Sequence, residues 1–236
     1  MSKYSPTKKA KNNRQLRGQL IGLAARLMYE EGVSQYFDAK RIAARRLLKQ
    51  GGGGGFRIID LPSNGEIANA VAALAALHEG DARTERLFAM RVIALDIMEH
   101  LSAFNPRLIG SVSTGRIRAG SDIDIHVFSD SLEPLEAQLN RLGWRYHTEQ
   151  VSIQKNGKLE DYTHVYLHQH FPIELSVYPA NDIRSQGRSS TDGKPIIRMK
   201  PQALQALISE AHNDYWIAYL KTNELVGLAT DQDEAD

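Results

Sequence analysis

The chain has 236 residues, 42% hydrophobic and 24% charged, with a net charge of +1, so it can bury a full core as one large domain or two small ones. It contains no cysteine, which excludes a disulfide framework and thiolate chemistry. No apolar run approaches the ~18 residues of a membrane span, and no apolar signal core follows the basic N-terminus, so we expect a cytoplasmic protein without a membrane partner.

The small net charge conceals an uneven distribution. Residues 1–50 carry twelve lysine or arginine residues against three acidic ones, whereas residues 231–236 are acidic. A solvated helix face explains such a run, and the alternative is an arm that binds RNA or another polyanion. No aromatic residues are interleaved with the basic ones, which favours the solvated face.

Apolar residues at helical spacing predict two helices within residues 14–49, separated near Gly32. The five consecutive glycines Gly51–Gly55 follow a helix and precede a strand-like segment. A phosphate-binding loop needs the opposite order, so we interpret these glycines as a flexible linker.

The next segment is also helical. Ser63 and Glu66 form a capping-box pattern that predicts a helix from there to about residue 78, and a further helix is expected from about 83 to 101. Residues 1–100 are therefore expected to form a helical, basic N-terminal region.

Near residue 107 the hydrophobic period changes from that of helices to that of strands. We expect strands at 107–110, 122–128, 144–153, 162–169 and 172–178, a short helix at 133–142, and a helix at 201–220. This order predicts an α+β fold. A mixed sheet at 101–182 would carry helices on one face, and residues 183–236 would form a loop, a C-terminal helix and an acidic tail.

Three of the strands alternate apolar with polar side chains, so their polar side chains share one face of the sheet. That face carries the acidic residues Asp122, Asp124 and Glu174, together with His126, His164, Tyr166 and His168. Carboxylates on one face repel one another and lose hydration, which a purely structural strand does not require. One or two bound Mg²⁺ ions would need such a group of carboxylates as ligands, so we interpret these residues as metal ligands.

Gly110 and Ser111 precede the first two carboxylates by about ten residues. Glycine lets the backbone come close to a phosphate, and the serine hydroxyl and the amides that follow can donate hydrogen bonds to it. This pair therefore indicates a phosphate-binding half of the same site.

In its combined motifs the chain resembles the DNA polymerase β-like nucleotidyltransferase superfamily, and most of all its small bacterial members. The resemblance rests on Ile109-Gly110-Ser111, Gly115, Ser121-Asp122-Ile123-Asp124-Ile125 and Ile173-Glu174-Leu175, in this order. It covers about residues 101–180 and leaves the flanking helices unexplained.

The resemblance implies a mechanism for the site. Asp122 and Asp124 would hold Mg²⁺ on a nucleoside triphosphate, with ATP the expected nucleotide, and Glu174 would help to hold a second ion beside the acceptor hydroxyl. A nucleoside monophosphate would then be transferred with release of pyrophosphate. The residues expected to contact the nucleotide are Gly110, Ser111, Gly115, Arg116 and Ser121, with Arg118 nearby in the sequence.

The acceptor stays open among RNA, a protein hydroxyl and a small molecule. The residues expected to line an acceptor or base pocket are His126, His164, Tyr166, His168, Arg188 and Lys194, the last two from the polar loop 187–195. For His126 the alternative is a hydrogen-bonded histidine at the rim of the site, and for this loop the alternative is an ordinary solvated loop. The spacing of His164, His168 and His170 does not match a common zinc signature.

Two other functions remain open at this point. The same fold can serve as a non-catalytic nucleotide- or nucleic-acid-binding regulatory module, as in a toxin–antitoxin pair. The chain can also be a helical nucleic-acid-binding protein in which the sheet is a scaffold. The presence of all three carboxylates and of Gly110-Ser111 favours the enzyme.

Overall fold

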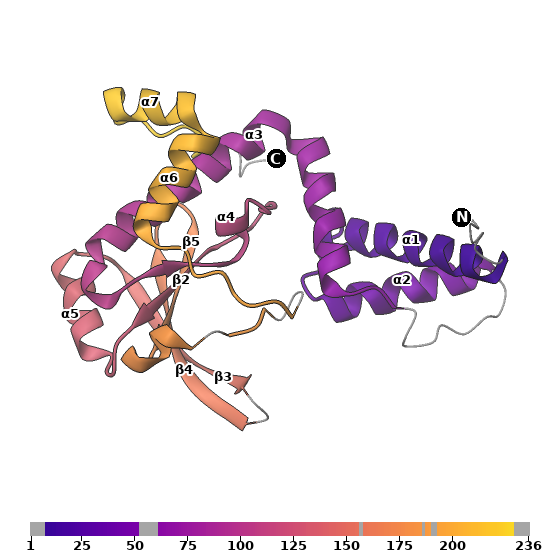
Figure 1. Cartoon of the computed structure of the whole chain (residues 1–236), viewed down its shortest axis with the longest axis horizontal. Coiled ribbons are helices and arrows are strands. Elements are labelled where there is room, and N and C mark those ends of the chain that lie inside the picture. Colours follow the sequence, from indigo (N-terminus) through magenta and orange to yellow (C-terminus); the bar gives the residue numbers. More distant parts are fainter. Residues whose placement is uncertain (1–7, 52–60, 156–157, 186, 190–192, 229–236) are drawn as a thin grey trace, which may run out of the picture. The chain divides into compact units, whose positions relative to one another are not determined.

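A computed structural model describes residues 8–51, 61–155, 158–185, 187–189 and 193–228 (Figure 1). The chain divides into two compact units, one ending at Glu79 and the other running from Gly80 to Ser189 and resuming at Lys194. Most of the predicted glycine linker and the whole acidic tail lie outside the described residues.

The first unit is helical, as predicted. It contains α1 (Lys8–Tyr29), α2 (Tyr36–Gly51) and the first half of α3 (Asn64–His100). The interval between α1 and α2 includes Gly32, whose φ of 69° suits glycine. A separate apolar core holds this unit together, built from residues such as Leu20, Leu27, Ala39, Ile67 and Val71.

The predicted capping box at the start of α3 is confirmed. The Ser63 N–H donates to Glu66 Oε2 at 2.8 Å, and the Glu66 N–H donates to Ser63 Oγ at 3.2 Å. Arg17 of α1 adds a two-pronged contact, donating to the two carboxylate oxygens of Glu66 at 3.0 and 2.6 Å. The helix start is thereby fixed to its neighbour by charge-assisted hydrogen bonds.

Several basic residues of the first unit are engaged in ion pairs. Arg17 pairs with Glu66 at 2.6 Å, Arg41 with Asp38 at 3.0 Å and Arg46 with Glu31 at 2.6 Å. These arginines thus sit on partly solvated helix faces with acidic partners, which supports the solvated-face interpretation of this basic region.

Gly80 interrupts α3 with φ 49° and ψ −127°, backbone angles that are not helical. The two helices predicted to end near residue 78 and to begin near 83 therefore meet at this glycine. The division between the units also lies here rather than after residue 100. The reason is that residues 87–100 of α3 bury Phe88, Met90 and Met98 in the core of the second unit.

The second unit is built on a five-stranded mixed sheet, which confirms the predicted α+β class. The strands are β1 (Arg107–Leu108), β2 (Ile123–Phe128), β3 (Tyr146–Lys155), β4 (Lys158–His168) and β5 (Pro172–Tyr178). Their order across the sheet is β1-β2-β5-β4-β3, and only β2 and β5 run parallel. The first strand is shorter than predicted because a short helix, α4 (Gly110–Thr114), begins at Gly110.

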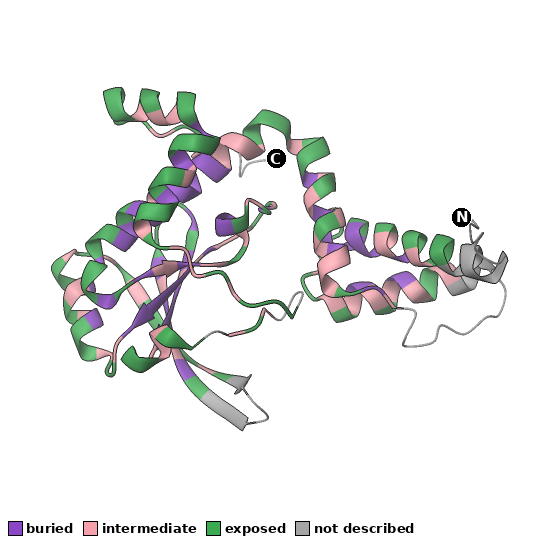
Figure 2. Ribbon diagram, viewed as in Figure 1, coloured by how far each residue is buried: buried purple, intermediate pink, exposed green. Residues whose placement is uncertain are grey.

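Apolar side chains from alternate strand positions form the core of this unit on one face of the sheet. They include Ile123, Ile125, Val165, Leu175 and Val177, and they pack with the second half of α3 and with α5 (Glu133–Arg141), the helix predicted between β2 and β3. Figure 2 shows the buried residues concentrated on these strands and along the sheet-side helices. The alternation leaves the polar side chains to the other face.

The predicted helix at 201–220 is two helices, α6 (Pro201–Ala211) and α7 (Asn213–Thr222). His212 separates the two helices, with non-helical backbone angles of φ −136° and ψ 37°. Its ring is buried, and its Nε2 lies 3.0 Å from Arg91 Nη1. Burial and the neighbouring Arg91 lower the pKa of His212 to about 4, so its neutral ring accepts the arginine hydrogen bond. Within the described part of the chain, no helix is long and apolar enough to cross a membrane.

Candidate functional site

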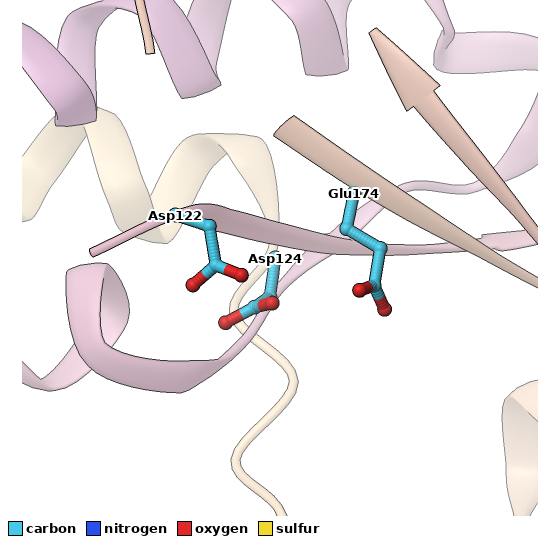
Figure 3. A group of neighbouring side chains, drawn as sticks. All are labelled: Asp122, Asp124 and Glu174. Atoms are coloured by element: carbon cyan, nitrogen blue, oxygen red, sulfur yellow. The ribbon is translucent and has the colours of Figure 1, made fainter. Parts of the chain in front are cut away.

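The structure brings the three predicted carboxylates together on the polar face of the sheet (Figure 3). Asp122 immediately precedes β2, Asp124 lies on β2, and Glu174 lies on β5. Parallel pairing puts Asp124 directly opposite Glu174. One carboxylate oxygen from each of the three residues lies within 4.8 Å of the others, so a single cation can contact all three.

The three carboxyl groups differ in their tendency to ionise. Burial, followed by repulsion from Asp122 and Glu174, raises the pKa of Asp124 to about 8. Burial also raises the pKa of Asp122, whereas a hydrogen bond from His164 lowers the pKa of Glu174. Without a cation, Asp124 therefore keeps a proton near neutral pH, and a bound cation would replace that proton.

Side chains on β4 and β5 contact the carboxylate of Glu174. His164 Nδ1 lies 2.8 Å from Glu174 Oε1, and Ser176 Oγ donates to the same oxygen at 3.2 Å. Tyr166, opposite Glu174 in the β4–β5 pairing, also lowers the pKa of this carboxyl. His164 and Tyr166 were expected near the site, whereas Ser176 was missed, although it is the next residue along β5 on the same face.

Gly110 allows the chain to pass directly beside Asp124. Its φ is 68°, and a Cβ added to it would lie 2.2 Å from Asp124 Oδ2. The preceding residue is tied to the same strand, because the Ile109 N–H donates to the Asp124 carbonyl at 3.0 Å. Only glycine combines this backbone angle with this close approach.

Ser111 contributes a polar atom that lacks a partner. Its Oγ is buried, and none of the described residues forms a hydrogen bond with it. A buried hydroxyl without a partner is unfavourable, so such a group indicates a bound ligand or water at this position. Its place next to Gly110 agrees with the predicted phosphate-binding role.

Arginines on the second half of α3 hold the segment that follows Ser111. Arg91 Nε donates to the Val112 carbonyl at 3.2 Å, and Arg83 donates to the carbonyls of Gly115 and Ile117. Sequence reasoning missed both arginines, because nothing in a helical pattern distinguishes a cation that binds a distant loop from a solvated one.

The remaining residues of the predicted nucleotide-binding set close this loop. The Arg116 N–H donates to the Ser111 carbonyl at 2.9 Å, and the Arg118 N–H donates to Ser121 Oγ at 2.9 Å. Gly115 ends α4 with a left-handed φ of 74°. These contacts give Gly115, Arg116 and Ser121 a structural part in the loop, and their contact with a nucleotide stays a prediction.

His126 is a buried histidine that takes part in an internal hydrogen bond. It is 3% exposed, and its Nδ1 accepts a hydrogen bond from Arg198 Nε at 3.1 Å. Burial, with the nearby Arg198, lowers the pKa of His126 to about 3, so the ring is neutral. Arg198 also donates to the carbonyls of Asp182 and Ser185 at 2.8 and 2.6 Å. His126 thus forms an internal contact with the chain that follows β5.

Of the other predicted pocket residues, His164 is buried beside Glu174 and the remaining four lie at or near the surface. Tyr166 and His168 lie on the polar face of β4, where Tyr166 is partly exposed and His168 is exposed. Arg188 and Lys194 lie on two segments that face each other in antiparallel fashion, where Arg188 forms a bridge with Pro195 and the Ser189 N–H donates to the Lys194 carbonyl. Their place in an acceptor or base pocket stays a prediction.

Comparison with known proteins found no match. No protein-family model matches the chain, and neither a curated protein nor a solved structure shows significant similarity to it. The residues and geometry of the site therefore carry the functional argument.

Proposed function

We propose that the chain is a Mg²⁺-dependent nucleotidyltransferase that moves a nucleoside monophosphate from a nucleoside triphosphate, ATP being the expected donor, to a hydroxyl acceptor. The observation that carries this proposal is the convergence of Asp122, Asp124 and Glu174 on one face, beside the Gly110 turn. The resemblance of these motifs to DNA polymerase β-like nucleotidyltransferases points the same way.

The residues fit Mg²⁺ and a triphosphate. Three carboxylates with oxygens within 4.8 Å offer the hard oxygen ligands that Mg²⁺ takes. Burial and repulsion from Asp122 and Glu174 raise the pKa of Asp124 to about 8, and a bound cation would offset that repulsion. The buried hydroxyl of Ser111 has no partner among the described residues and can donate to a phosphate oxygen. When bound, Mg²⁺ would offset the triphosphate charge and lower the pKa of the acceptor hydroxyl.

In the proposed reaction the acceptor oxygen attacks the α-phosphorus. A new P–O bond forms as the bond to the oxygen that bridges the α- and β-phosphates breaks, pyrophosphate leaves with that oxygen, and the acceptor proton passes to water. Gly110 and Ser111 bind phosphate oxygens in this scheme. Glu174 stays ionised, because Ser176 donates to it and His164 Nδ1 lies 2.8 Å from it. It lies on the side of the site away from Gly110.

The test uses the purified full chain with Mg²⁺ and each nucleoside triphosphate labelled at either the α- or the γ-phosphate, with RNA, protein and small hydroxyl compounds as separate acceptors. We expect α-label and no γ-label on the acceptor. Asp122→Asn and Asp124→Asn should abolish the transfer, whereas Asp214→Asn, which changes an exposed residue at the start of α7, should not.

Two results would contradict the proposal. Transfer of the γ-label would indicate a phosphotransferase. Mg²⁺-dependent nucleotide binding without transfer to any acceptor would favour the alternative function, a regulatory nucleotide-binding module on the same fold.

A further inference from the structure

Beyond Glu174, the polar face of the sheet carries a row of aromatic rings that the proposed chemistry does not use. The rings of Tyr166 and His147 are stacked, with centroids 5.0 Å apart and planes 19° from parallel. The ring of His168 continues the row, 5.2 Å from His147, and its Nε2 lies 3.2 Å from His147 Nδ1. We call Tyr166, His147 and His168 the ring platform.

Strand pairing fixes the ring platform next to the carboxylates. Asp124 of β2 faces Glu174 of β5, Glu174 faces Tyr166 of β4, and Tyr166 faces His147 of β3. One continuous row of side chains therefore crosses the polar face from the acidic cluster to the edge strand. Tyr166 joins the two parts, since it is the register partner of Glu174 on one side and of His147 on the other.

The ring platform and the phosphate-binding turn lie on opposite sides of the cluster. Gly110 and Ser111 follow β1, which pairs with β2 at one edge of the sheet, whereas His147 lies on β3 at the other edge. If the triphosphate occupies the β1 side, the β4–β3 side is left for the molecule that supplies the attacking hydroxyl.

The size and exposure of the ring platform suit a nucleobase. Adjacent strands lie ~4.8 Å apart, so Tyr166 and His147 lie about one and two strand spacings from Glu174, comparable with the distance from a base to the hydroxyls of its own sugar. His147 and His168 are exposed, and flat exposed rings bind bases by stacking with little dependence on sequence. A serine or threonine acceptor carries no ring to cover them.

We propose that the ring platform stacks the base of the acceptor, so that the acceptor is a nucleoside hydroxyl, either at the 3′ end of a single-stranded RNA or on a free nucleotide. This inference rests on the proposed function for its chemistry, although the base-binding surface is testable by itself.

The binding test uses the full chain and a short single-stranded RNA whose 3′-terminal base is the fluorescent analogue 2-aminopurine. Stacking on the ring platform should quench the fluorescence, and a matched RNA with an abasic 3′ terminus should compete about tenfold more weakly, since one stacked base is lost. His147→Ala should weaken binding by a similar factor, and His147→Tyr should restore it because the ring returns. Gln150→Ala, an exposed residue on the opposite face of β3, is the matched control and should bind as the wild type does.

A second probe, 2-aminopurine riboside monophosphate, distinguishes a free nucleotide from an RNA end as the acceptor. Quenching by both probes, with comparable affinities, supports a free nucleotide as acceptor, and quenching of the RNA alone supports an RNA end. Equal binding of the base-ended and abasic RNAs would overturn the inference, as would unchanged binding by His147→Ala.

The outcomes separate this inference from the proposed function. Base-dependent quenching that His147→Ala removes, without any transfer of α-label, would support the ring platform and reject the transferase. Transfer of α-label to base-ended and abasic RNA alike, or to protein alone, would support the transferase and reject the ring platform as its acceptor site.

Discussion

The close approach of Gly110 to Asp124 makes a sharp prediction about a single methyl group. In Gly110→Ala the new Cβ would lie 2.2 Å from Asp124 Oδ2, which is too close, so the carboxylate must rotate out of the cluster. The alanine must also adopt a φ of 68°, which costs roughly 1–2 kcal/mol of folding free energy. We therefore expect a modest loss of stability, together with a loss of Mg²⁺ affinity of about tenfold or more, because a ligand has been displaced.

Gly143→Ala is the matched control for the backbone cost. Gly143 has nearly the same φ, 70°, and nothing lies within 4 Å of a Cβ added there, so this variant should lose similar stability and keep its Mg²⁺ affinity. Urea unfolding followed by tryptophan fluorescence reports the stability of the second unit, since both tryptophans, Trp144 and Trp216, pack against its core. Calorimetric titration measures the affinity for Mg²⁺. Equal Mg²⁺ affinities in the two alanine variants would refute the reasoning.

Three further predictions follow from the charges. Asp124→Asn should raise the stability of the metal-free second unit at about pH 8 by more than about 1 kcal/mol. The pKa of Asp124 is about 8 in the folded chain and 3.8 for a free carboxyl, so this gain in stability should fade as the pH drops towards about 4. A gain that persists at about pH 4 in urea unfolding would contradict the raised pKa. Glu66→Gln should destabilise the first unit by about 1 kcal/mol, measured by following helical circular dichroism during unfolding. Arg17 and Ser63 lower the pKa of Glu66 from 4.5 to about 2. The loss of stability should therefore be full above about pH 4.5 and vanish near pH 2. Arg198→Met should reduce the stability measured by tryptophan fluorescence by roughly 1.5–3 kcal/mol, since its hydrogen bonds are charge-assisted, and an unchanged midpoint would show that these contacts are replaced by water.

Local patterns predicted most of the secondary structure, because they depend on spacing along one segment. The capping box at Ser63 and the alternation of Asp122 and Asp124 with Ile123 are signals of this kind, and the structure confirms the elements that they predict. The position of Glu174 beside Asp124 also follows, since two-faced strands in one sheet bring their polar faces together.

The features that were missed depend on contacts between segments far apart in the sequence. The break between α6 and α7 occurs because His212 turns in to meet Arg91, 121 residues earlier, whereas the helical spacing of apolar residues continues past it. Arg198 is a similar case: its partners are His126, 72 residues earlier, and two carbonyls. A charged residue in a polar segment gives no sign that it will be half-buried.

The parallel pairing of Asp124 with Glu174 has a consequence for folding kinetics. The two residues lie 50 positions apart in the chain, and their strands become neighbours only after the intervening α5, β3 and β4 have been accommodated. Such long-range pairing forms late, because loop closure opposes it. A cation that needs both carboxylates thus finds no ligand set in the unfolded chain, so Mg²⁺ should leave the refolding rate unchanged and slow the unfolding rate.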